Sequence, residues 1–136
     1  MSHRPSNIEL LAQAFAGWGK DNPANMPDLL HPDCELVVPE SLPYGGTFRG
    51  AEAVIAWFTR DLWRWFDEFT STPEGFVDGG DQIVVPVRVQ ARAKTGKSMD
   101  VHNVWIYEFA EGKLIRGRVY ADTAVVRDTV EAVAGE

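Results

Sequence analysis

Apolar and polar residues alternate most regularly between Met99 and Thr123, and this pattern predicts two strands joined by a tight turn at Glu111-Gly112. Because neighbouring side chains on a strand point to opposite sides, one face of the first strand carries Val101, Asn103, Trp105, Tyr107 and Phe109. The other face carries His102, Val104, Ile106 and Glu108, so neither face is polar throughout. We expect such a strand to be covered on both sides, by helices on one and by a partner subunit on the other.

The second strand of this hairpin combines small and branched residues with charged ones. Alternation places Ile115, Gly117, Val119 and Ala121 on one face, and on the other Leu114, Arg116, Arg118, Tyr120 and Asp122. Large aromatic side chains of the first strand would then lie opposite small residues. This arrangement predicts a cavity beside the hairpin.

Helical spacing of apolar residues predicts four further elements. The segment Ser6-Asn7-Ile8-Glu9 is typical of a capped helix start, and Phe15 and Trp18 continue its apolar stripe. A short helical turn is expected over Asn25 to Leu30, and a long helix from Ala51 to about Phe69, with a stripe broad enough to cover a sheet. A last helix is predicted from Ala124 to about Val133.

Further strands are predicted at Cys34 to Val38 (after a turn at His31-Pro32-Asp33), Thr70 to Val77 and Ile83 to Ala93. The stretch from Glu40 to Gly50 is predicted to be a loop, of a length that often serves as a lid. The order is helix, helix, strand, helix, a meander of four strands, and helix. It predicts one α+β domain over residues 1–136, with a curved sheet wrapped around the helices.

Composition narrows the function classes. A formal net charge of −7 argues against binding of a nucleic-acid backbone. The lone cysteine, Cys34, excludes an internal disulfide and is expected to be a small buried hydrophobe. His3 and His31 lack neighbours at metal-ligand spacing and no phosphate-binding fingerprint is present, so no metal and no other cofactor is expected. Without an apolar run typical of a signal peptide or a membrane helix, the chain is expected to be soluble and cytoplasmic.

Several short segments resemble the SnoaL-like and ketosteroid isomerase-like superfamily, and uncharacterised bacterial SnoaL-like proteins most closely. They are His31-Pro32-Asp33, residues 42–50 (LPYGGTFRG), Val104-Trp105 with Glu111-Gly112-Lys113, and Tyr120-Ala121-Asp122-Thr123. The resemblance implies the nuclear transport factor-like cone fold, an α+β barrel in which a mixed or antiparallel sheet curves around the N-terminal helices. It also implies isomerase, cyclase, dehydratase, epoxide hydrolase or non-catalytic binding activity.

The proton-handling groups of the isomerase do not carry over. By the resemblance, its general-base aspartate falls on Val38, its oxyanion-hole tyrosine on Phe15 and its protonated aspartate on Trp105. SnoaL-like proteins often carry a histidine just before the Val-Trp pair, where this chain has Asn103. His102 is one position earlier and is therefore expected to point away from the cavity.

Three residues are candidates for chemistry. Asp122 is the nearest match to the acid/base of the polyketide cyclases, and the alternative is that it caps the last helix. Asn103 could orient a ligand carbonyl or a water, or be satisfied internally. Tyr44 could reach over the cavity mouth, or be an ordinary loop aromatic. The residues expected to line the cavity are Phe15, Trp18, Val38, Trp57, Phe58, Trp105, Tyr107 and Val119.

Two function classes follow from these candidates. The first is a cofactor-independent isomerase, cyclase, dehydratase or hydrolase that uses Asp122 with help from Asn103 or Tyr44. The second is a non-catalytic carrier or accessory protein with the same pocket. Both bind a hydrophobic small molecule, and both are expected as a homodimer through the sheet, in part because Val104 and Ile106 place apolar side chains on its outer face.

Overall fold

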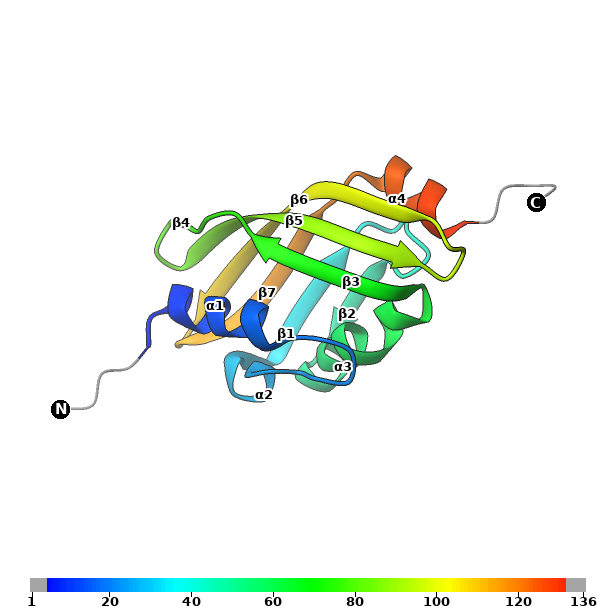
Figure 1. Cartoon of the computed structure of the whole chain (residues 1–136). Helices are drawn as coiled ribbons and strands as arrows, with labels where there is room; N and C mark the ends of the chain where they lie inside the picture. The colour runs from blue at the N-terminus through cyan, green and yellow to red at the C-terminus, as the bar shows by residue number, and fades with distance from the viewer. Residues whose placement is uncertain (1–4, 132–136) are drawn as a thin grey trace.

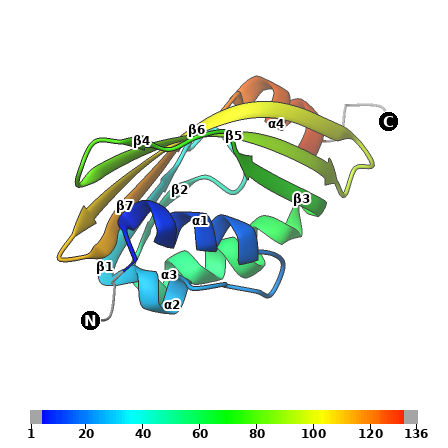
Figure 2. The same cartoon turned by 60° about the vertical axis from the view of Figure 1, so that its left-hand side comes forward.

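The structure is a computed structural model that describes residues 5–131. A strongly curved sheet encloses three helical elements on its concave side, as Figures 1 and 2 show. The helices are α1 (Asn7–Gly17), α2 (Met26–Leu29) and α3 (Ala51–Ala56), and α3 continues into a π-helical turn (Trp57–Asp61) and a 3-10 turn (Leu62–Arg64). A fourth helix, α4 (Thr123–Val130), packs beside the sheet. His3 and the predicted end of the last helix at Val133 lie outside the described residues.

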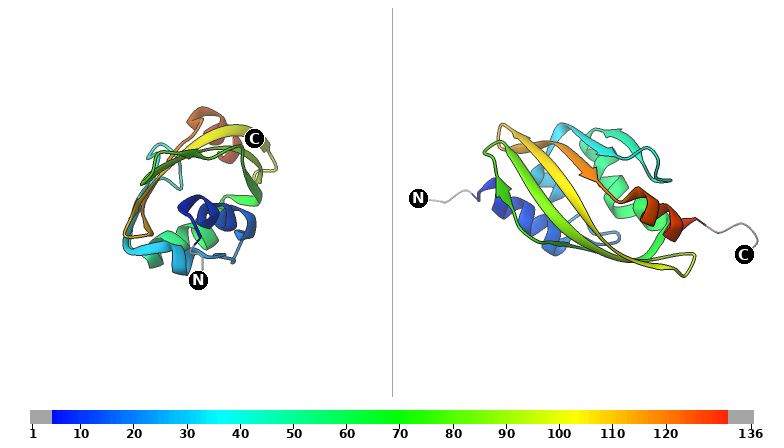
Figure 3. Two further views of the ribbon diagram at one scale, coloured as in Figure 1. Left: turned by 90° about the vertical axis from the view of Figure 1, so that its left-hand side faces the viewer. Right: turned by 90° about the horizontal axis from the view of Figure 1, so that it is seen from above.

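The sheet is mixed, and its strand order is β2-β1-β7-β6-β5-β3. The strands are β1 (Leu30–Val38), β2 (Gly46–Arg49), β3 (Phe66–Pro73), β4 (Val77–Asp78), β5 (Gln82–Ala93), β6 (Ser98–Ala110) and β7 (Lys113–Tyr120). Only the β1–β7 pair is parallel among the described strands, and β4 adds a short pairing to β5. The end-on view in Figure 3 shows the sheet curving around α1 without closing. The predicted α+β class with a curved sheet is confirmed.

The strands β3, β5, β6 and β7 form the predicted meander, and their alternation builds the core. Inward residues of β5 and β6 are buried at every second position, from Ile83 to Ala93 and from Met99 to Phe109. From Ile83 to Ala91, the register pairs each inward residue of β5 with an inward residue of β6, for example Val85 with Trp105. A continuous apolar face therefore lies against α1 and α3.

The predicted face of β7 is wrong at its first residues. Phe109 pairs with Leu114 but Glu108 pairs with Arg116, so Ile115 is an extra residue that forms a bulge after the turn. The bulge moves Leu114 to the inner face, where it is buried, together with Gly117 and Val119. The prediction assumed strict alternation from the turn onward, and a one-residue insertion reverses the face.

Three predicted boundaries also differ. The expected loop at Glu40 to Gly50 contains β2, which pairs with β1 at the sheet edge. The predicted turn at His31-Pro32-Asp33 lies inside β1, which begins at Leu30 and has an irregular register there. The long helix expected to reach Phe69 ends at Arg64, and β3 begins at Phe66. No glycine or proline marks this end, and its aromatic residues suit a strand as well as a helix.

Candidate functional site

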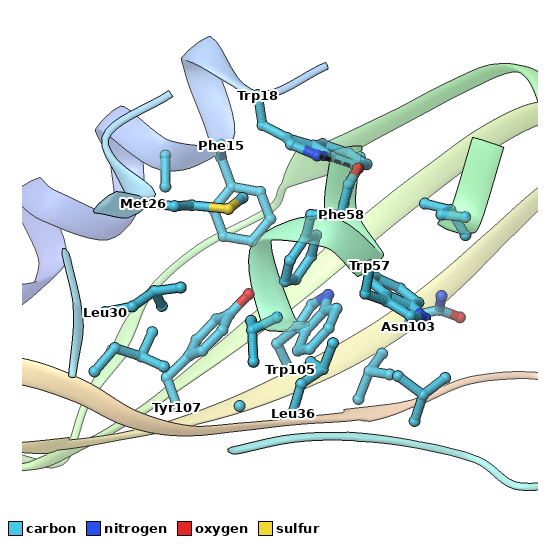
Figure 4. Close-up of a pocket in the computed structure, with 18 of the residues that line it drawn as sticks. Phe15, Trp18, Met26, Leu30, Leu36, Trp57, Phe58, Asn103, Trp105 and Tyr107 are labelled. Atoms are coloured by element: carbon cyan, nitrogen blue, oxygen red, sulfur yellow. Dashed lines mark hydrogen bonds between the residues drawn. The ribbon is translucent and has the colours of Figure 1, made fainter. Parts of the chain in front are cut away.

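A cavity lies between the concave face of the sheet and the helices. It has a volume of about 90 Å³, measured as the space open to the centre of a water molecule. That is several times the ~10–15 Å³ that one water needs by the same measure. Figure 4 shows aromatic side chains converging on it from α1, from the π-helical turn and from β6. All of the predicted lining residues border the cavity: Phe15, Trp18, Val38, Trp57, Phe58, Trp105, Tyr107 and Val119.

The sheet side of the cavity is formed mainly by β6, which directs Asn103, Trp105 and Tyr107 inward. The rings of Trp105 and Tyr107 are stacked, with centroids 5.4 Å apart and an interplanar angle of 6°. Gly117 lies opposite Tyr107 on β7, and a Cβ atom there would lie 3.3 Å from Cδ1 and Cε1 of the Tyr107 ring. The predicted pairing of large aromatic residues with a small residue is therefore present, and Gly117 lets the Tyr107 ring lie close to the sheet.

The helical side depends on an unusual hydrogen-bond pattern. The Leu62 amide donates to the Trp57 carbonyl, five residues earlier, where an α-helix would use the Phe58 carbonyl. The Phe58 carbonyl instead accepts hydrogen bonds from the indole nitrogens of Trp18 and Trp63, both at 2.9 Å. The first of these bonds is drawn in Figure 4. The Trp18 indole thereby joins the end of α1 to the helix that covers the sheet, and the Trp63 indole comes from the 3-10 turn of that same helix.

Asn103 is the polar side chain that stands out in this apolar surrounding. It is 9% exposed, and its Oδ1 atom is buried without a hydrogen-bond partner in the described part of the chain. Polar atoms buried in this way are rare in native proteins, because each costs about 1–3 kcal/mol. The alternative of an internally satisfied Asn103 is therefore wrong for this oxygen.

Three titratable groups that line the cavity, Tyr107, Tyr44 and Cys34, are held in their neutral forms. Burial raises the pKa of the Tyr107 phenol well above its ordinary value, and burial raises the pKa of Tyr44 in the same direction. Burial also raises the pKa of the Cys34 thiol, which is fully buried at the cavity border. At neutral pH these groups can donate hydrogen bonds but do not provide a base.

Glu35 is the one carboxylate among the described lining residues, and it is already paired. Arg49 and Arg116 lie opposite it on β2 and β7, and each donates to its carboxylate at 3.1 Å. The Arg49 guanidinium is the first cause of its lowered pKa, and Arg116 adds to it. Glu35 is thus a stable anion within a cross-strand ion-pair group, which leaves it poorly suited to accept a proton from a ligand.

The structure places Asp122 outside the cavity. Its side chain is exposed, and its Oδ1 accepts a hydrogen bond from the Val125 amide at 3.3 Å, so it is the N-cap of α4. Ala121, one residue earlier, borders the cavity in its place. The interpretation of Asp122 as an acid/base beneath a hydrophobic pocket is corrected, because β7 ends at Tyr120 and the chain then turns into the helix.

Tyr44 does border the cavity, but it is held in place. Its ring contacts Trp57 and Phe66 with centroids 6.0 and 5.8 Å apart, and its carbonyl accepts a hydrogen bond from the Trp57 indole at 2.9 Å. His102 points away from the cavity, as expected, and forms an exposed pair with Glu74 at 2.8 Å. Tyr44 and Asn103 are therefore at the site, and Asp122 and His102 are not.

Sequence patterns did not identify several lining residues. Most are aliphatic residues of α1, α2 and β1 or contacts created by the bulge in β7, and they include Leu11, Met26, Leu30, Leu36 and Leu114. Phe15 also contacts Phe76 edge to face, with centroids 6.4 Å apart. The apolar stripe of α1 gave a signal for Leu11, whereas the place of Leu114 at the cavity depends on tertiary geometry.

Comparison with known proteins now identifies the family. The sequence profile of the SnoaL-like domain matches residues 11–117. The chain belongs to the SnoaL-like domain family. An uncharacterised protein of Mycobacterium tuberculosis is 26% identical to this SnoaL-like chain over 120 residues, which cover 88% of this chain and 92% of that protein.

Solved structures share the fold of this SnoaL-like chain. An NTF2-like protein of unknown function from Burkholderia pseudomallei has a TM-score of 0.82 at 24% identity, with 95% of this chain and 100% of that chain covered. A putative SnoaL-like polyketide cyclase from Jannaschia sp. CCS1 has a TM-score of 0.79 at 22% identity, with 97% and 99% covered. Identities this low establish the cone fold and leave the chemistry to the residues of the site.

Those residues depart from the isomerase pattern inside the SnoaL-like fold. The three positions expected for its proton-handling groups hold Val38, Phe15 and Trp105, and all three side chains border the cavity.

Among the described residues, no three His, Cys, Asp or Glu side chains gather as they would around a metal ion. No helix within residues 5–131 is long and apolar enough to cross a membrane.

Proposed function

We propose that this SnoaL-like protein binds an apolar, ring-containing small molecule in the cavity between β6 and the helices. The observation that carries the proposal is the Asn103 amide, which is buried among aromatic side chains with no partner for its oxygen. Binding sites for small molecules are typically apolar with a few polar groups that fix orientation. A ligand hydroxyl or carbonyl beside Asn103 would complete this arrangement.

The energetic argument favours a ligand with a polar group at Asn103. Without a partner, the buried amide lowers stability by about 1–3 kcal/mol. A bound molecule that hydrogen-bonds to it recovers that free energy and adds the burial of its own apolar surface. An entirely apolar ligand would gain only the second contribution. The amide therefore provides orientation and selectivity, and the aromatic side chains provide most of the affinity.

The experiment is native mass spectrometry of the purified protein, followed by a thermal-shift screen of polyketides, steroids, terpenes and aromatic acids. A specific ligand should raise the melting temperature in proportion to occupancy. The matched variant Asn103→Leu keeps the number and branching of the side-chain heavy atoms and removes the amide. We expect it to bind hydroxyl- or carbonyl-bearing ligands more weakly. If no class stabilises the wild type and no molecule co-purifies, the binding proposal is wrong.

A cofactor-independent reaction on the bound molecule is the second candidate, and the neutral Tyr107 phenol favours it. A neutral phenol and an amide can donate hydrogen bonds to a carbonyl oxygen as negative charge develops on it. The putative polyketide cyclase among the structural neighbours makes cyclisation of a carbonyl compound the first reaction to test. Liquid chromatography with mass spectrometry on stabilising ligands would distinguish a catalyst, which converts them, from a carrier, which returns them unchanged.

Homodimerisation through the outer face of the sheet belongs to the same proposal. Outward residues form two adjacent rows across the strands, with Pro86, Val104 and Tyr120 in one, and Val84 and Ile106 in the next, which Arg118 ends on β7. Val104 is 36% exposed and Tyr120 is 51% exposed, so this apolar surface is available to a second copy.

The oligomeric state is tested by size-exclusion chromatography with light scattering. Val104→Glu should give a monomer because it places a charge in the centre of the interface. Val125→Glu is the matched control, since Val125 has a similar exposure of 37% but lies on α4. A monomeric wild type, or equal dimerisation of both variants, would contradict the proposed interface.

A further inference from the structure

The cavity contains a second unpaired polar group at some distance from Asn103. Tyr107 lies four residues further along β6 on the same face, with its Cα about 13 Å from that of Asn103 at the usual rise of a strand. Its side chain is 7% exposed, and its hydroxyl has no hydrogen-bond partner in the described part of the chain. In Figure 4 this hydroxyl points from the sheet toward Phe15, while Asn103 lies beyond Trp105, beside Trp57.

The position of the Tyr107 hydroxyl is fixed by the packing of its ring. One neighbour is the stacked indole of Trp105, and another is Phe15, which meets the ring edge to face with centroids 6.3 Å apart. The backbone of Gly117 occupies a third side, close enough that a Cβ atom there would lie only 3.3 Å from the ring. A group held by three neighbours loses little entropy when it binds a ligand, so it is suited to recognition.

The surface between the two polar groups is apolar. Trp105 lies between them on the strand, and Phe58 lies across from it with ring centroids 5.9 Å apart. Tyr44 contacts Trp57 and so adds a phenol near the Asn103 end. The cavity thus has two polar groups that are separated along β6, with aromatic rings between them.

We propose that the cavity selects elongated ring-containing molecules that carry a hydrogen-bonding group at both ends, one for the Asn103 amide and one for the Tyr107 hydroxyl. This inference rests on the proposed function and adds the shape and polarity of the ligand. Because the buried phenol stays protonated, it donates to an oxygen such as a hydroxyl or a carbonyl. Single-ended molecules satisfy only one of the two groups and bind less tightly.

The test uses three probes with the same two-ring core: biphenyl, 4-hydroxybiphenyl and 4,4′-dihydroxybiphenyl. Quenching of tryptophan fluorescence reports binding directly, since Trp57 and Trp105 border the cavity. For the wild type, each added hydroxyl should tighten binding by about 2- to 10-fold, the effect of one net hydrogen bond. Tyr107→Phe should lower the affinity for the dihydroxy probe by the same factor and leave that for biphenyl unchanged.

The control is Tyr120→Phe, which makes the same chemical change on the outer face of the sheet, where Tyr120 is 51% exposed. It should leave all three affinities unchanged, and melting temperatures would confirm that both variants fold. Equal affinities for the three probes, or no effect of Tyr107→Phe on the dihydroxy probe, would overturn the two-ended ligand while leaving an apolar pocket. Failure of all three probes to bind would overturn the proposed function and this inference together.

Discussion

Replacing Asn103 by leucine is expected to stabilise the protein while weakening its binding of polar ligands. The substitution removes a buried oxygen that has no partner within the described residues, at a position that is 9% exposed. Leucine has the same number and branching of side-chain heavy atoms and no polar atom to leave unpaired. The expected gain in the free energy of unfolding is about 1–3 kcal/mol, the cost of burying an unpaired polar group.

The gain can be measured by urea unfolding followed by circular dichroism and by the melting temperature. For a chain of 136 residues, 1 kcal/mol corresponds to about 3–4 °C. The predicted rise in melting temperature is therefore about 3–12 °C. Such a gain at the expense of ligand affinity is the trade-off expected of a residue kept for function.

Asn25→Leu is the matched control for this prediction. The Oδ1 of Asn25 is also buried without a partner, but its Nδ2 donates to the Leu10 carbonyl at 3.0 Å. Loss of this bond between α1 and the start of α2 should cancel the gain or reverse it by about 0.5–1.5 kcal/mol. If Asn103→Leu destabilised the protein as much as Asn25→Leu, the amide of Asn103 would be satisfied in solution and the reasoning from its isolation would be refuted.

Three further changes test the packing and charges around the site. Gly117→Ala places a Cβ atom 3.3 Å from the Tyr107 ring. Calorimetry should therefore show that the free energy of unfolding falls by about 1–2 kcal/mol. An unchanged melting temperature would contradict the close packing. Trp18→Phe and Trp63→Phe each remove one donor to the Phe58 carbonyl. Urea titrations should show that the double variant loses more free energy of unfolding than the two single variants together. Strict additivity would argue against a shared acceptor. Glu35 has a pKa below its ordinary value of 4.5, so its ion pairs stabilise the fold above that pH and are lost as the pH falls through the folded-state pKa. Glu35→Gln should therefore be less stable than the wild type at pH 7, with a difference that shrinks toward pH 3; a difference independent of pH would exclude this linkage.

The alternating strands were the part of the fold most accessible from the sequence. The inward set Asn103, Trp105 and Tyr107 on β6 is as predicted, because an uninterrupted alternation leaves one choice of face. Leu114 was assigned to the wrong face because a bulge is set by the turn and the partner strand, which single-sequence periodicity does not contain. The missed β2 has another cause: it is a short strand at the sheet edge, within a stretch whose glycines and proline are typical of a loop.

The candidate site was also predictable only where local sequence patterns determine the position of a side chain. Aromatic residues on predicted inner faces were placed correctly at the cavity, since burial follows from pattern. The role of Asp122 depended on where β7 ends. On the strand, its side chain could have faced the cavity as an acid/base, whereas after the strand it could cap the last helix. The strand ends at Tyr120. The exposed position of Asp122 at the N-cap of α4 follows the common preference of aspartate for helix starts. Local capping chemistry was a better guide here than the resemblance to the polyketide cyclases.

The π-helical turn connects the fold to the cavity in a way that no periodicity indicates. Because the Leu62 amide bonds to Trp57, the Phe58 carbonyl is free to accept both indole donors, and α1 is thereby fixed against the helix that follows β2. The same turn allows the adjacent residues Trp57 and Phe58 both to border the cavity, with their rings edge to face and centroids 4.8 Å apart. A regular α-helix would use that carbonyl within its own backbone and would leave the two indoles without this acceptor. The hydrogen bonds that hold the helices together and the aromatic surface offered to a ligand thus depend on one local departure from α-helical geometry, as is frequent for π-turns at functional sites.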